Sequence, residues 1–180
     1  MRIVGGEYKG RILKPGKKFK ARPTTDIAKE SLFNILENRY DISQLKVLDL
    51  FSGTGSISYE FASRGCENIV LVEQDFTHYN FIRKVISELD IHSIKPIRSD
   101  VFKFIERYYS PFDLIFADPP YELKILGKIP ELIITSKVFH KDSILILEHP
   151  KNYDFSKHSQ FKELRRYGNV HFSFFSFQKD

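Results

Sequence analysis

Hydrophobic and polar positions follow two alternating patterns between about residue 45 and residue 148. Short apolar runs predict buried strands at residues 46–51, 68–73, 96–98, 113–117 and 143–148. Between them, apolar residues recur every three or four positions and predict helices at residues 57–63, 76–89, 101–109 and 130–136. Such an alternation is typical of a parallel sheet with helices packed on both faces.

The last part of the chain departs from this alternation. Residues 161–167 and 170–177 both have the pattern of a strand, with only Gly168 and Asn169 between them. So short a connection requires an antiparallel hairpin. We therefore predict an α/β fold with a seven-stranded, mostly parallel sheet and an antiparallel hairpin at one edge.

The beginning of the chain is rich in turn residues. Residues 1–22 contain five glycines and prolines between short apolar runs, which predicts a small β-hairpin followed by an open loop. A helix is expected next, with Thr24 or Thr25 as its cap. Asp26 would lie in the first turn of this helix, where the helix dipole favours an acid.

Positive charge is concentrated in the same region. The chain has a net charge of +5, and its first 30 residues hold nine of the 28 lysines and arginines but only three of the 23 acids. A basic arm indicates a polyanionic partner, although a solvated tail without a partner has the same composition. We divide the chain into a basic hairpin arm, residues 1–23, and a main domain, residues 24–180. The candidate contacts to a polyanion in the arm, which would be RNA contacts if the partner is RNA, are Arg2, Lys9, Arg11, Lys17, Lys18, Lys20 and Arg22.

Size and composition limit the class of protein further. With 180 residues, 42% of them hydrophobic, the chain has the material for one globular domain. Cys66 is the only cysteine, which excludes an intramolecular disulfide and fits a reducing compartment. No apolar run approaches the roughly 18 residues of a membrane span, and the first residues lack the apolar stretch of a signal peptide. We expect a soluble, cytoplasmic protein without a membrane partner.

A glycine-rich loop, residues 49–56, connects the strand at 46–51 to the helix that follows. Glycine at this place lets a ligand approach the backbone, and ligands of open α/β sheets bind at the carboxyl ends of the strands. A phosphate-binding P-loop is excluded because Gly55 is followed by Ser56 and Ile57 rather than by Lys. A dinucleotide fingerprint is disfavoured by Ser58 at its last small position, and Asp49 before the loop would repel a pyrophosphate.

Acidic residues follow successive strands of the predicted sheet. Asp49 would accept hydrogen bonds from an ammonium group, and Glu73 lies where a carboxylate binds ribose hydroxyls. Asp100 would accept a hydrogen bond from an adenine amine. S-adenosylmethionine has these three parts and carries no phosphate. The simpler interpretation of each acid alone is a solvated strand end, but their regular placement favours a shared pocket.

The strand at residues 113–117 runs directly into Asp118-Pro119-Pro120-Tyr121. The prolines stiffen this corner and remove two backbone donors, which leaves the Asp118 carboxylate and the Pro119 carbonyl as acceptors. Two acceptors beside an aromatic face suit a planar base with an exocyclic amine. The six histidines form no pair with ligand spacing, so we expect no metal site. Glu148 closes a strand that faces the site; a strand-end acid is the favoured interpretation, and a substrate contact is the alternative.

Taken together, these motifs resemble a class I methyltransferase, and the whole chain resembles the bacterial 16S ribosomal RNA guanine-N2 methyltransferases (RsmD-like). The family-specific pieces are residues 2–6 with 9–11, residues 22–26, and Glu30-x-Leu32-Phe33-Asn34. The resemblance implies a Rossmann-like fold, S-adenosylmethionine as cofactor, and 16S rRNA as partner, within an assembled or assembling small subunit. The expected cofactor contacts are Asp49, Phe51, Ser52, Gly53, Gly55, Glu73, Gln74, Asp100 and Val101, and the expected catalytic residues are Asp118, Pro119, Pro120 and Tyr121.

Three alternatives remain open. Tyr121 stands where this family more often has Phe, and Tyr is typical of adenine-N6 methyltransferases acting on RNA or DNA. Against a sequence-specific DNA enzyme, 180 residues leave no room for a target-recognition domain. A non-catalytic RNA-binding assembly factor would not need the complete corner at 118–121. An NAD-binding protein is disfavoured by Ser58 and by the closing hairpin.

Overall fold

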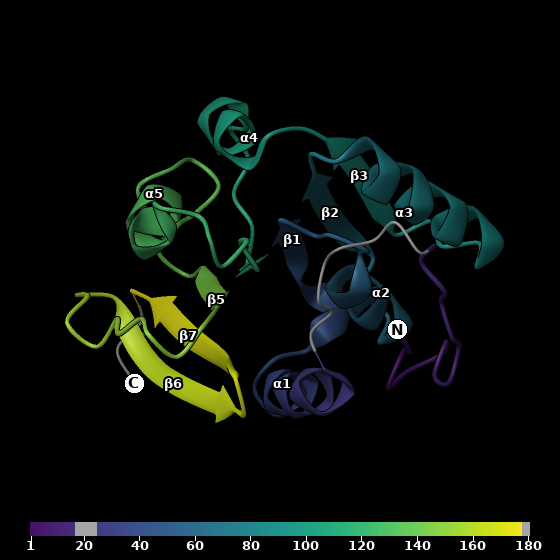
Figure 1. Ribbon diagram of the computed structural model, residues 1–180, viewed down its shortest axis with the longest axis horizontal. Coiled ribbons are helices and arrows are strands. Elements are labelled where there is room, and N and C mark those ends of the chain that lie inside the picture. Colours follow the sequence, from purple (N-terminus) through teal and green to yellow (C-terminus); the bar gives the residue numbers. More distant parts are fainter. Residues whose placement is uncertain (17–24, 178–180) are drawn as a thin grey trace.

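A computed structural model describes residues 1–16 and 25–177 (Figure 1). Its seven strands form one sheet and are β1 (Lys46–Leu50), β2 (Asn68–Glu73), β3 (Ile94–Arg98), β4 (Leu114–Ala117), β5 (Ile144–His149), β6 (Phe161–Tyr167) and β7 (Val170–Ser176). The α-helices are α1 (Asp26–Arg39), α2 (Ser56–Ser63), α3 (Phe76–Glu88), α4 (Val101–Arg107) and α5 (Ile129–Ile134). Two 3-10 turns, Ile42–Gln44 and Leu126–Lys128, have no counterpart in the sequence pattern.

The sheet confirms the predicted fold class. Its strand order is β3-β2-β1-β4-β5-β7-β6, with the first five strands parallel and the last two antiparallel. Figure 1 shows the β6–β7 hairpin at one edge and β3 with α3 toward the other. Because β7 is antiparallel to β5, the turn at Gly168 and Asn169 lies at the carboxyl ends of the parallel strands.

Side chains alternate between the two faces of the sheet, as the period of a strand requires. In β1, Val47 packs on one face with α1, α2 and α3, whereas Leu48 and Leu50 pack on the other with α4 and α5. Asp49 lies between these apolar positions and is 1% exposed. The same alternation that builds the core therefore carries a carboxylate to the end of the central strand.

The N-terminal residues pair as a short antiparallel bridge, Arg2 with Ile12. Ile3 and Leu13 are buried in the same apolar cluster as α1 and α2. Gly6 has a φ of +71°, and a Cβ there would overlap the Ser63 carbonyl, which explains why glycine occupies this position. The arm thus packs against α2 through its first 13 residues. The proposed boundary at residue 23 lies outside the described residues.

A buried ion network, which the sequence analysis did not predict, joins the arm to both helices. Lys29 of α1 donates to the Arg2 carbonyl at 2.5 Å and to Glu60 of α2 at 3.1 Å. Arg64 donates to the second Glu60 oxygen at 2.6 Å and stacks on the Phe33 ring. Both charges of the Lys29–Glu60 pair are almost fully buried, so each needs the other to remain satisfied.

Candidate active site

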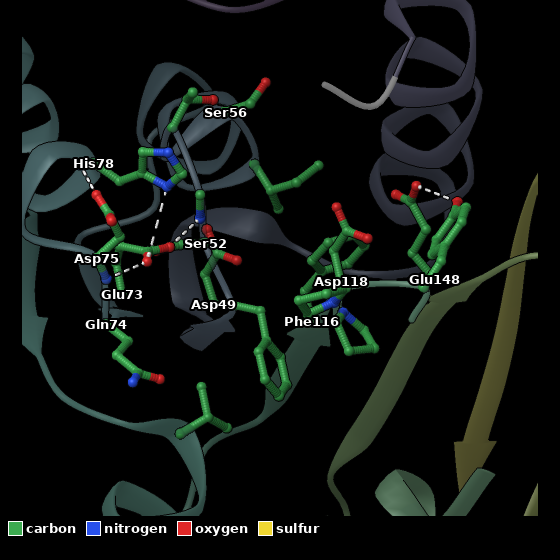
Figure 2. A pocket seen from close by; sticks show the side chains of 18 of the residues that line it. Asp49, Ser52, Ser56, Glu73, Gln74, Asp75, His78, Phe116, Asp118 and Glu148 are labelled. Atoms are coloured by element: carbon green, nitrogen blue, oxygen red, sulfur yellow. Dashed lines mark hydrogen bonds and ion pairs between the residues drawn. The ribbon is translucent and has the colours of Figure 1, made fainter. Parts of the chain in front are cut away.

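A cavity of about 610 Å³ opens at the carboxyl ends of β1, β2, β4 and β5. Its lining brings the glycine loop and the residues after β2 together with the corner after β4, although more than 60 residues separate the loop from the corner along the chain. Figure 2 shows Glu73 and Asp75 on one side of this cavity, Asp118 and Glu148 on the other, and Asp49 between them. The cavity thus has two ends. We call them the loop end, formed by the glycine loop and Glu73, and the corner end, formed by residues 118–121 and Glu148.

Positive φ angles shape the glycine loop. Phe51, Gly53 and Gly55 have φ values of 57°, 55° and 79°. Gly53 lines the cavity, and a Cβ built there meets no heavy atom closer than 3.9 Å, so the space above it is open to a ligand. Gly55 does not line the cavity. It caps α2 and packs on the Tyr59 ring, so its role is to permit the turn.

Glu73 is held rigidly at the end of β2. One carboxylate oxygen accepts from the Gly53 N–H and the other from the Asp75 N–H, both at 2.7 Å. The side chain of His78 approaches the same carboxylate, with its Nδ1 3.9 Å from the Glu73 oxygen. Backbone donors hold the carboxylate in place, and each of its oxygens keeps a second lone pair for a ligand hydroxyl.

Asp49 is the most deeply buried acid of the loop end. The Ser58 hydroxyl donates to it at 2.6 Å, so the residue that disfavours a dinucleotide fingerprint serves here to orient the carboxylate. Burial raises the pKa of Asp49 to about 7, more than the hydrogen bonds from Ser58 lower it, and the charge of Glu73 adds to the rise. A cationic group bound here would restore the ionised form.

The other expected cofactor residues divide into two groups. Phe51, Ser52, Gln74 and Val101 line the cavity. Asp100 does not; its side chain caps α4 by accepting from the Lys103 N–H at 3.0 Å. The sequence pattern had placed Asp100 correctly after β3 but could not tell a cap from a ligand contact.

All four residues of the corner, from Asp118 to Tyr121, line the cavity. The pKa of the Asp118 carboxyl is raised well above its ordinary value, first by burial, then by the charge of Glu148 and by that of Asp49. Tyr121 is 39% exposed at the cavity mouth, and its hydroxyl donates to a Glu148 oxygen at 3.2 Å.

Glu148 lies at the end of β5, as expected for a strand-end acid, but it is not solvated. Glu148 is 3% exposed, lines the cavity and contacts Tyr121. The sequence analysis also missed Thr25, Thr54, Ser56, Ile57, Asp75, His78, Phe116, Glu122, Asn169 and Val170, which share the lining. For Asn169 and Val170 a signal existed, because an antiparallel β7 must begin where the parallel strands end.

The described lining contains no lysine or arginine, whereas six of its residues are acids. Phosphate groups are usually held by basic side chains or by several free backbone N–H groups. In the glycine loop, the Gly53 N–H already donates to Glu73. The cavity therefore favours a ligand with positive charge and hydroxyls over a phosphorylated one. Within residues 1–16 and 25–177, no group of three or more His, Cys, Asp or Glu side chains could hold a metal ion.

The candidate RNA contacts of the arm are only partly visible. Arg2 forms an ion pair with Asp26 at 3.2 Å, and Lys9 and Arg11 are exposed. The Met1 sulfur accepts from the hydroxyl of Thr54, a cavity residue, at 3.3 Å, so the arm begins beside the cavity. Lys17, Lys18, Lys20 and Arg22 lie outside the described residues. Among the residues that are described, no helix has the length and apolar character to cross a membrane.

Comparison with known proteins decides the family. The family model described as "Conserved hypothetical protein 95" matches residues 1–176. The chain belongs to this family. "Putative rRNA methyltransferase YlbH" of Bacillus subtilis is 31% identical over 158 residues, which cover 86% of this chain and 85% of that protein. "Ribosomal RNA small subunit methyltransferase D" of Escherichia coli strain K12 is 28% identical over 148 residues, which cover 82% of this chain and 74% of the relative.

A solved structure shares the whole fold. A hypothetical protein from Thermus thermophilus superposes with a TM-score of 0.87 and 26% identity, covering 98% of this chain and 99% of that one. The family match begins at residue 1 and therefore includes the N-terminal arm. Membership of the family confirms the resemblance inferred from the motifs of the sequence.

Proposed function

We propose that the chain transfers a methyl group from S-adenosylmethionine to the exocyclic N2 amine of a guanine in 16S rRNA of the small ribosomal subunit. The observation that carries this proposal is the shared lining of one cavity by Asp49, Glu73 and the corner at Asp118. The relatives named as small-subunit rRNA methyltransferases support the substrate class. The context of an assembled or assembling subunit is part of the proposal.

At the loop end, the residues fit the parts of S-adenosylmethionine. The Asp49 carboxylate would hold the ammonium group of its amino-acid part, and Glu73 the ribose hydroxyls. Gly53 lets the cofactor approach the backbone, since no side chain occupies that space. The bound cofactor supplies an electrophilic methyl group on a sulfonium. The acids around it add favourable electrostatics for a cation.

At the corner end, Asp118 and the Pro119 carbonyl would accept hydrogen bonds from the two N–H groups of the target amine, and the Tyr121 ring would stack on the base. These contacts localise the nitrogen lone pair toward the methyl group. As the N–C bond forms and the C–S bond breaks, positive charge develops on the nitrogen and is stabilised by Asp118. The raised pKa of Asp118 makes this carboxylate the better acceptor for the proton that the nitrogen then loses.

Two experiments test the proposal against its alternatives. Calorimetry should detect S-adenosylhomocysteine binding and no NAD binding, and the reverse result would end the methyltransferase assignment. Labelled methyl groups from S-adenosylmethionine should enter RNA of small subunits isolated from cells without this protein. Transfer to DNA instead would indicate a DNA enzyme, and no transfer to either would support an assembly factor.

Affinity for S-adenosylhomocysteine should depend on pH through Asp49. Because burial raises its pKa to about 7, acidification neutralises the carboxylate that holds the ammonium group. Between pH 8 and pH 6 the affinity should therefore fall by about tenfold, following the ionised fraction. Asn at this position keeps an acceptor for Ser58 but cannot titrate, so Asp49→Asn should bind weakly and without this pH dependence. A wild-type affinity that is constant from pH 8 to pH 6 would contradict the role of Asp49.

The exposed basic residues of the arm should contribute to RNA affinity. The double change Lys9→Gln and Arg11→Gln should weaken RNA binding and reduce the slope of log affinity against log salt by about one to two units. Affinity for S-adenosylhomocysteine should not change. Lys137→Gln with Lys141→Gln is the matched control, because these exposed lysines precede β5 and so lie toward the amino ends of the parallel strands, away from the cavity. An unchanged salt slope would show that the described part of the arm does not bind RNA.

A further inference from the structure

Glu148 is a buried carboxylate for which the proposed methyl transfer has no role so far. It lies at the end of β5, is 3% exposed and lines the corner end of the cavity beside Asp118 (Figure 2). The Tyr121 hydroxyl donates to its Oε1 at 3.2 Å. Asp118 lines the same end of the cavity, and after burial the charge of Glu148 is the largest cause of the raised pKa of Asp118.

Two carboxylates that share one end of a cavity repel each other. Burying a carboxylate is unfavourable unless hydrogen bonds compensate. An ionised carboxylate only accepts hydrogen bonds. With Asp118, Glu148 therefore provides a second carboxylate acceptor in the lining of the corner end, which suits a ligand edge with adjacent N–H donors.

The two candidate bases differ at the atom beside the reactive amine. In guanine the N2 amine is flanked by N1–H, a donor. In adenine the N6 amine is flanked by N1, an acceptor without a hydrogen. Asp118 and the Pro119 carbonyl can accept hydrogen bonds from the two N–H groups of the amine in either base. A second carboxylate beside them would accept from guanine N1–H and would repel adenine N1.

We propose that Glu148 determines the choice of base, its carboxylate accepting the hydrogen bond of guanine N1–H while Asp118 holds the N2 amine. The inference rests on the proposed function. It also gives the Tyr121 hydroxyl a task other than adenine recognition, since that hydroxyl donates to Glu148 and orients its carboxylate. A tyrosine at this corner is then compatible with guanine as the target.

The test compares guanine with 2-aminopurine, which has the same 2-amino group but no N1–H. The methylated nucleotide is first mapped in the wild-type product. Small-subunit RNA is then rebuilt by splint ligation with guanosine or 2-aminopurine riboside at that nucleotide, and the RNA is assembled into subunits. The kcat/KM for methyl transfer is measured on both for wild type, Glu148→Gln and Tyr121→Phe. Glu106→Gln, which removes an exposed carboxylate of α4, is the matched control.

We expect wild type and Glu106→Gln to prefer guanine by about 10²-fold or more, because a site built for N–H rejects an analogue without it. The amide of Glu148→Gln can donate to the bare N1, so its preference should shrink at least about tenfold. Tyr121→Phe should fall between the two. All variants should bind S-adenosylhomocysteine with wild-type affinity, which shows that the pocket is folded.

An unchanged preference for guanine in Glu148→Gln, whatever its absolute activity, would overturn the inference. If that variant is too slow to measure, an unchanged preference in Tyr121→Phe overturns it in the same way. The failure of the proposed function is a separate result. A wild-type product methylated at adenine N6 would refute both, whereas N2-methylguanine with an unchanged preference refutes the Glu148 assignment alone.

Discussion

Asp118→Ala is expected to lose most of the methyl-transfer rate while it keeps its affinity for S-adenosylhomocysteine. Asp118 lies at the corner end, and the proposed cofactor contacts lie at the loop end, so the substitution removes an acceptor for the target amine alone. Removal of one oriented partner of the transition state lowers turnover by about 10²-fold or more. Single-turnover methyl transfer to small-subunit RNA measures the rate, and calorimetry measures the affinity.

The control for this variant is Asp142→Ala, which removes an exposed carboxylate from the connection before β5. It should retain the wild-type rate. Because Asp118 is repelled by Glu148 and Asp49, the free enzyme should not be destabilised by Asp118→Ala. Near-normal turnover in Asp118→Ala would remove this carboxylate from the mechanism.

Gly53→Val should weaken the binding of S-adenosylhomocysteine severely. Gly53 has a φ of 55°, a conformation in which a β-branched residue is strained by about 1–3 kcal/mol. The new side chain would also enter the open space beside the cavity, and any shift of the loop would weaken the Gly53 N–H bond to Glu73. We expect an affinity loss on the order of 10²-fold or more, since about 1.4 kcal/mol corresponds to each tenfold step.

Gly65→Val separates backbone strain from loss of the binding site. Gly65 has a φ of 85° and open space around its Cβ position, but it follows α2 outside the cavity. This control should lower the free energy of unfolding and leave the affinity for S-adenosylhomocysteine intact. Full affinity in Gly53→Val would show that the cofactor does not approach this backbone.

The fold could be predicted from the sequence because its buried strands are short apolar runs, which the hydrophobic pattern shows directly. β2 matches the predicted range at both ends, and the Gly168-Asn169 turn alone predicts the antiparallel hairpin. The ion network of Lys29, Glu60 and Arg64 could not be predicted, since it depends on how the arm packs against α1 and α2. Charged residues in helices are normally solvated, so the sequence carries no signal of their burial.

Site residues at the ends of strands could be predicted from the sequence. Residues whose role depends on the direction of the side chain could not. Asp49 and Glu73 lie at the carboxyl ends of β1 and β2, and Asp118 directly follows β4, so the adjacency of these three parallel strands brings them together. Asp100 occupies an equivalent position, yet its carboxylate turns back to cap α4. For Glu148 the sequence favoured a strand-end acid over a substrate contact, because its contact with Tyr121 joins residues 27 positions apart.

The central claim is tested most directly by the identity of the methylated nucleoside. Small subunits isolated from cells that lack this protein are treated with the enzyme and labelled S-adenosylmethionine, and their RNA is digested to nucleosides for mass spectrometry. We predict that the label is found in N2-methylguanosine and that it is lost with Asp118→Ala. Label in N6-methyladenosine, or label that persists at full level in Asp118→Ala, would contradict the proposed function.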